Sequence, residues 1–145
     1  MSLRLSKNFS EREFTRSRTA RRLNIDNSFK SQQHRDNAIM FCENFLEPIR
    51  KVLNKPIFIT SGYRCQELNK VVGGVSNSAH IQGLAADFVV PEMSVPQIFD
   101  LICQARKEKL IPTWDQLLCE YGEWIHIGSR TQVAWNRGEE KKLFC

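Results

Sequence analysis

Three residues have the types and surroundings that suit the binding of one metal ion: His80, Asp87 and His126. Asp87 lies in the otherwise apolar run AADFVV, where burying a carboxylate without a cation or strong donors would be costly. In the segment IHI at residues 125–127, strand alternation sends both isoleucines to one face and His126 to the other. Two neutral imidazoles and one carboxylate are a usual ligand set for catalytic zinc, with water in the fourth position.

The same residues also fit plainer roles. A histidine on a strand is more often hydrogen-bonded than bound to a metal, and Asp87 could cap a turn. Ligand patterns of this looseness also match by chance. Residue types and spacing alone therefore leave both metal binding and ordinary hydrogen bonding open. The remaining histidine, His34, lies in a polar stretch, and we expect it to face solvent.

Three segments follow one another along the chain: SGYR at residues 61–64, SAHIQGLAAD at 78–87 and EWIH at 123–126. Together they resemble the signatures of the M15 zinc peptidases, in which a late histidine follows three positions after an acidic residue. That family includes D-Ala-D-Ala carboxypeptidases and dipeptidases, and phage L-alanyl-D-glutamate endolysins. The segment EPIR at 47–50 is similar to the short, phage-type branch. The resemblance covers residues 5–129.

The resemblance implies that His80, Asp87 and His126 hold zinc. It implies a peptidase that hydrolyses D-amino-acid-containing stem peptides of peptidoglycan, as a carboxypeptidase or an endopeptidase. It also implies Glu123 as the general base and then the general acid. In an ideal strand residues 123 and 126 face opposite sides, so Glu123 must belong to the turn before the strand. Glu120 lies nearby and is the alternative base.

Two further residues complete the implied site. Arg64 would stabilise the developing oxyanion or pair with a substrate carboxylate, as a fixed guanidinium does well. Ser78 would hydrogen-bond the substrate or orient His80. Gly83 is expected where the backbone turns sharply between two ligands. The alternative to an enzyme is a non-catalytic zinc-containing module that binds peptidoglycan.

Helical patterns dominate the first third of the chain. A capping box at residues 10–13 predicts a helix that fades by residues 24–27. Apolar spacing predicts a second helix over residues 31–53. Within it, Pro48 removes a backbone donor and predicts a kink near residues 44–47.

Strand patterns follow later, without regular alternation of strands and helices. This order predicts an α+β fold, in which N-terminal helices pack on a small, mostly antiparallel sheet that carries the zinc site. We expect residues 1–145 to form a single domain. The later elements are predicted as strands at 57–60, 85–90, 115–121 and 124–129, helices at 66–72 and 94–109, and one strand in the tail 132–145.

The chain has 145 residues, with 21 basic and 16 acidic side chains and a net charge of +5. A positive surface suits an anionic partner, but helical periodicity would spread the N-terminal arginines around the axis as a solvated face. A nucleic-acid-binding protein is supported only by this charge. The sequence has no helix-turn-helix, finger or RNA-recognition signature, so we expect no nucleic-acid partner. The arginines are Arg12, Arg16, Arg18, Arg21 and Arg22.

No run of about 18 apolar residues occurs, so we expect no membrane span. Five cysteines are an odd number and include no CxxC pair, which argues against a disulfide framework and favours buried thiols in a reducing compartment. Residues 1–7 lack the apolar core of an export signal. We therefore expect a monomer that is made in the cytoplasm and acts on the cell wall.

Overall fold

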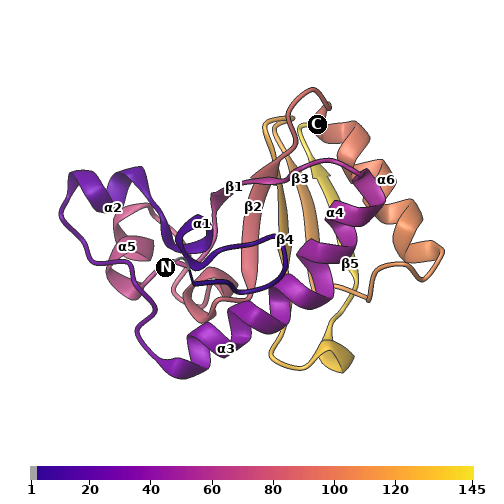
Figure 1. The fold of residues 1–145 in the computed structure, drawn as a ribbon. Coiled ribbons are helices and arrows are strands. Elements are labelled where there is room, and N and C mark those ends of the chain that lie inside the picture. The colour runs from indigo at the N-terminus through magenta and orange to yellow at the C-terminus, as the bar shows by residue number, and fades with distance from the viewer. Residues whose placement is uncertain (1–2) are drawn as a thin grey trace.

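The computed structural model describes residues 3–145. Met1 and Ser2, which begin both the predicted domain and the segment 1–7 considered as an export signal, lie outside the described residues. A five-stranded sheet in the order β1-β2-β4-β3-β5 forms its centre, with helices packed against it (Figure 1). The predicted α+β fold is confirmed. No helix among residues 3–145 is long and apolar enough to cross a membrane. The elements are α1 (Glu11–Thr15), α2 (Arg18–Arg22), α3 (Gln32–Phe41), the π-helix η1 (Cys42–Leu46), α4 (Glu47–Leu53), β1 (Phe58–Ser61), α5 (Gln66–Val71), the 3₁₀-helix η2 (Ala79–Gln82), β2 (Ala85–Val89), α6 (Val95–Lys107), β3 (Gln116–Glu120), β4 (Trp124–Gly128), the 3₁₀-helix η3 (Val133–Trp135) and β5 (Glu139–Leu143).

The register of the central strands separates a polar face from an apolar one. β2 and β3 both pair antiparallel with β4, and β5 pairs parallel with β3. Asp87 lies opposite His126, and His126 lies opposite Leu118. Because directly opposite residues point to the same side of a sheet, these three share one face. Their neighbours Phe88 and Ile125 point to the other face and are fully buried.

The apolar face of the sheet forms the core together with α3, α4 and α6. Burial of each large apolar side chain stabilises the fold by roughly 1.5–3 kcal/mol. The opposite face carries the polar groups Asp87 and His126, and η2 brings His80 to it. Fully buried members of the core include Phe41, Phe45, Ile49, Phe88, Ile98, Ile102, Leu117, Ile125 and Ile127.

Where a kink is predicted in the second helix, the structure has a π-helical turn. Between α3 and α4, the Glu47 amide donates to the Cys42 carbonyl five residues back rather than four. Pro48 follows in the first turn of α4, where its missing N–H is least costly. The run of helical segments therefore continues from Gln32 to Leu53 past the proline.

The N-terminal helix begins as predicted, because the Ser10 hydroxyl accepts a hydrogen bond from the Glu13 amide. The expectation that it runs on towards residue 24 is wrong. The Ser17 hydroxyl instead accepts from the Ala20 amide and starts a second short helix, α2. A serine that can cap competes with helix continuation. The Asn27 side-chain amide also donates to the Thr15 carbonyl, which withdraws that carbonyl from a helix.

The expectation that no cysteines pair is wrong for one pair. Cys119 in β3 and Cys145 form a disulfide across 26 residues of sequence. Pairing depends on β5 lying parallel to β3, which brings the end of the chain back beside the hairpin. The number of cysteines carries no information on this register. Cys42 and Cys65 are free and buried, as expected.

The disulfide restricts the unfolded chain, so its loss is expected to lower stability. For a closed loop of this length, Cys145→Ser should reduce the free energy of unfolding by about 3 kcal/mol. Urea denaturation under oxidising conditions measures the difference, and Cys103→Ser, which removes a free thiol, is the matched control. Equal unfolding midpoints for Cys145→Ser and the unchanged protein would contradict the pairing.

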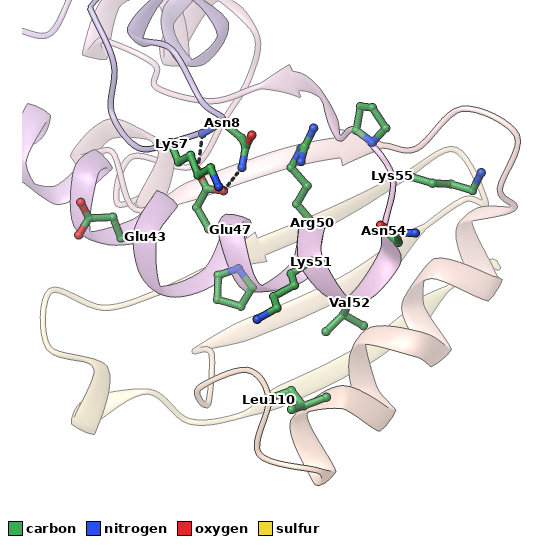
Figure 2. Close-up of a pocket in the computed structure, with 12 residues that line it drawn as sticks. Lys7, Asn8, Glu43, Glu47, Arg50, Lys51, Val52, Asn54, Lys55 and Leu110 are labelled. Atoms are coloured by element: carbon green, nitrogen blue, oxygen red, sulfur yellow. Dashed lines mark hydrogen bonds between the residues drawn. The ribbon is translucent and has the colours of Figure 1, made fainter.

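Glu47 of α4 hydrogen-bonds to the N-terminal segment at Ser6 and Asn8. Its Oε2 accepts hydrogen bonds from the Ser6 hydroxyl and the Asn8 amide, at 2.5 and 2.7 Å. Its Oε1 accepts from the Asn8 side chain at 2.6 Å (Figure 2). Burial opposes ionisation of this carboxyl, but the hydrogen bonds and the charge of Arg50 outweigh burial, so its pKa lies below the ordinary value. The ionised form therefore stabilises the fold.

A lowered folded-state pKa stabilises the protein above the unfolded pKa, and this contribution is lost as the pH falls. Glu47→Gln is expected to lower the free energy of unfolding by about 1–2 kcal/mol at neutral pH. The difference from the unchanged protein should narrow as the pH falls from neutral towards about 3, because protonation of Glu47 removes the charge that glutamine also lacks. Urea titrations at the two pH values test this. Glu43→Gln is the control, because Glu43 lines the same surface hollow as Glu47. A difference in the free energy of unfolding that does not depend on pH would refute the stabilising role of the ionised Glu47.

Candidate active site

The structure brings together the three residues that the sequence proposes as metal ligands. His80 comes from η2, Asp87 from β2 and His126 from β4. Each offers one ligand atom, and these atoms lie within 4.8 Å of one another. Nε2 of His80 lies 3.3 Å from Oδ1 of Asp87, and Nδ1 of His126 lies 2.7 Å from the same oxygen. This group could hold one metal ion.

The orientation of His80 fixes which of its nitrogens is available. Nδ1 lies 2.6 Å from the Gly62 carbonyl, which can only accept a hydrogen bond, so Nδ1 carries the proton. Nε2 then presents its lone pair towards Asp87. This atom is buried and makes no hydrogen bond within residues 3–145. Burial also lowers the pKa of His80, which favours the neutral form that binds metals.

The Asp87 carboxylate is only 16% exposed, yet its surroundings keep it ionised. Burial alone would raise its pKa. The interactions of the carboxylate with the imidazoles of His80 and His126 outweigh burial and hold the pKa of Asp87 well below its ordinary range. The Arg64 guanidinium adds a further cation, with Nη2 at 4.0 Å from Oδ2. A buried carboxylate in this setting is a ready ligand for a cation.

Arg64 is held rigidly beside the metal-binding group. Its Nε donates to the Ser61 hydroxyl at 3.3 Å, and its Nη1 donates to the Asn69 side-chain oxygen at 2.9 Å. An irregularity in β1 between Ile59 and Ser61 lets Ser61 lie opposite Asp87. Sequence reasoning found Arg64 but missed Ser61 and Asn69 as the residues that position it.

Asn27 fixes the backbone on both sides of Arg64. Its side-chain amide donates to the Tyr63 carbonyl at 2.9 Å, and its oxygen accepts from the Cys65 amide at 2.8 Å. No local pattern in the sequence marks this role. His34 also departs from its expected solvent-facing position, because Nδ1 lies 2.9 Å from the Tyr63 hydroxyl and the two rings pack together.

Two glutamates lie near the hairpin between β3 and β4, and they differ in where they face. Glu120 ends β3 opposite Trp124, so the register places it on the same face as His126. Burial and the charge of Asp87 raise the pKa of Glu120, although His126 and Arg64 oppose them. Glu123 lies in the turn, as expected, and is exposed to solvent. Glu120 is therefore the glutamate that faces the metal-binding group.

Ser78 borders a hollow of about 630 Å³ that extends from His126 along the polar face of the sheet. Its hydroxyl accepts a hydrogen bond from the His80 amide at 3.2 Å, so it caps η2. Gly83 ends η2 with a φ of 78°, the left-handed conformation that glycine adopts at least cost. Both residues thus shape the segment that presents His80. A separate hollow between the N-terminal segment, α4 and Leu110 is lined by none of these residues (Figure 2).

Comparison with known proteins agrees with this geometry. A family model described as Peptidase M15 matches residues 7–128, which include Arg64, the His80–Asp87–His126 group and both glutamates of the hairpin. The comparison with curated proteins gave no match. The matched region covers more than four fifths of the chain. The chain therefore belongs to the M15 peptidases, a family of metallopeptidases.

Proposed function

We propose that the protein is a zinc-dependent peptidase that hydrolyses D-amino-acid-containing stem peptides of peptidoglycan. The observation that carries this proposal is the buried Nε2 of His80, which has a free lone pair, faces Asp87 and makes no hydrogen bond within the described chain. Two ligands of a tetrahedral zinc ion lie about 3.3 Å apart, close to the separation of these two atoms. The donor set of two imidazoles and one carboxylate also suits zinc.

When bound, zinc would polarise the scissile carbonyl and make an attacking water more acidic. Glu120 takes the proton from that water as general base and returns it to the leaving amine as general acid. Its raised pKa suits both steps near neutral pH. Arg64, fixed by Ser61 and Asn69, stabilises the negative charge that develops on the carbonyl oxygen.

The shape of the cleft supports cleavage within a peptide rather than removal of its last residue. One hollow of about 630 Å³ adjoins His126, and another of about 370 Å³ adjoins Arg64. A peptide bound at the metal-binding group would then have space beside His126 and beside Arg64. We therefore infer endopeptidase activity, with Ser78 as a hydrogen-bonding residue along the first hollow. Digestion of purified muropeptides, with mass spectrometry of the products, identifies the bond that is cut.

Zinc binding tests the ligand set directly. The purified protein is expected to bind about one zinc ion, and His126→Ala should lose most of it, because one of three protein ligands is gone. Zinc is measured by elemental mass spectrometry after dialysis. His34→Ala removes an imidazole outside the group and should keep the metal. Equal zinc in His126→Ala and the unchanged protein would refute the proposed site.

The general base is tested by a matched pair of glutamate variants. Glu120→Gln should lower kcat by about 10²–10⁴ while zinc remains bound, because only the proton acceptor is removed. Glu123→Gln should change kcat by less than about twofold, as expected for an exposed turn residue. Rates are measured on muropeptides by chromatography.

If only Glu123→Gln lowers kcat, Glu123 and not Glu120 is the general base. Protein that binds zinc and muropeptides but leaves them uncut would instead identify a non-catalytic module. The three results differ in product formation and in which variant affects it.

A further inference from the structure

The break between α1 and α2 gathers arginines that a continuous helix would have dispersed. Arg16 lies in the link between the helices, and Arg18 and Arg21 belong to α2. All three line one hollow of about 620 Å³ together with Phe58 and Thr60 of β1. The expectation that periodicity spreads these charges around one axis is therefore wrong, because the Ser17 cap starts a separate helix.

A second hollow joins this basic surface to Arg64. Arg16 and Arg18 line it together with Arg64, Ser61 and Leu68 of α5, and its volume is about 370 Å³. Helices α2 and α5 accordingly lie beside each other near α1 (Figure 1). Arg64 is the residue whose guanidinium lies 4.0 Å from Asp87. The arginine surface thus extends to Arg64, whose guanidinium borders the metal-binding group.

The charges of this surface are not neutralised within the described part of the chain. No aspartate or glutamate lines either hollow. Arg16 donates to the Ile59 carbonyl at 3.3 Å and lies 4.8 Å above the Phe58 ring, contacts that hold it in place without cancelling its charge. A cluster of cations in a hollow attracts an anionic group, and guanidinium is well suited to bind carboxylate.

We propose that Arg16, Arg18 and Arg21 form a carboxylate-binding extension of the active-site cleft, which selects stem peptides with a free carboxylate near the scissile bond. This inference rests on the proposed function for its choice of substrate. Continuity with Arg64 favours a group of the substrate itself over a separate anionic polymer. A charge on the peptide can then reach the arginines while the scissile bond lies at the metal-binding group.

The test uses two synthetic stem peptides that differ in one group. One carries D-glutamate with a free α-carboxylate, the other carries the corresponding amide, and both have amidated C-termini. Binding to zinc-loaded Glu120→Gln protein, in which the peptide is expected to stay intact, is measured by calorimetry. The carboxylate peptide should bind about tenfold more tightly at low salt. Raising the salt concentration should reduce this ratio.

Substitution of the arginines should remove the preference. In the combined variant Arg16→Gln, Arg18→Gln, Arg21→Gln, the ratio of the two affinities should fall to about one. Arg22→Gln is the matched control, because Arg22 is exposed on the same helix and lines neither hollow. Thermal unfolding of each variant verifies the fold. Equal binding of both peptides before substitution, or the same loss in Arg22→Gln, would overturn the proposal.

Cleavage by protein that retains Glu120 separates this proposal from the proposed function. Preferential binding of the carboxylate peptide without cleavage would support the arginine site and refute the hydrolysis. Cleavage of both peptides with equal kcat/KM would support the hydrolysis and refute the arginine site.

Discussion

The site depends on one electrostatic constraint, the burial of the Asp87 carboxylate in a strand with apolar neighbours. A buried charge is tolerated only where opposite charges and donors surround it, and removing one partner of such a set typically costs about 3–5 kcal/mol. The structure meets the constraint with His80, His126 and Arg64, which come from three different segments. The same convergence that stabilises the carboxylate creates a group of ligand atoms for a metal ion. Both the stability of the buried carboxylate and the binding of a metal ion therefore require His80 and His126 to converge on Asp87.

Sequence reasoning succeeded where local pattern decides the structure. The lone acid in the apolar run around Asp87 and the alternation around His126 identified the polar face, and Pro48 identified the interruption of the long helix. It failed where contacts through space decide. The Cys119–Cys145 disulfide depends on a parallel strand pairing, and the role of Asn69 depends on its distance to a side chain five residues earlier. Neither has a signature in spacing or composition. The prediction of a single domain stays a prediction.

The two hairpin glutamates show how spacing along the chain and position in the sheet can favour different side chains. A spacing of three residues before His126 describes distance along the chain, whereas access to the cleft depends on the side of the sheet. In an antiparallel hairpin, alternation carries Glu120 to the side of His126, and the turn carries Glu123 into solvent. Register therefore supports Glu120 where the family resemblance implies Glu123. A choice between them requires knowledge of the strand pairing, which no short motif contains.

The charged sequence of the last strand, β5, affects whether molecules of the protein associate through their sheet edges. β5 forms one edge of the sheet, where unpaired backbone groups could recruit a strand from another molecule. Its sequence EEKKL carries four charges in succession, and two of them pair back onto α6 through Arg106 and Asp100. Charged side chains on an edge strand oppose the docking of a further strand. A strand that contributes no residue to the metal-binding group thus protects the sheet against edge-to-edge aggregation.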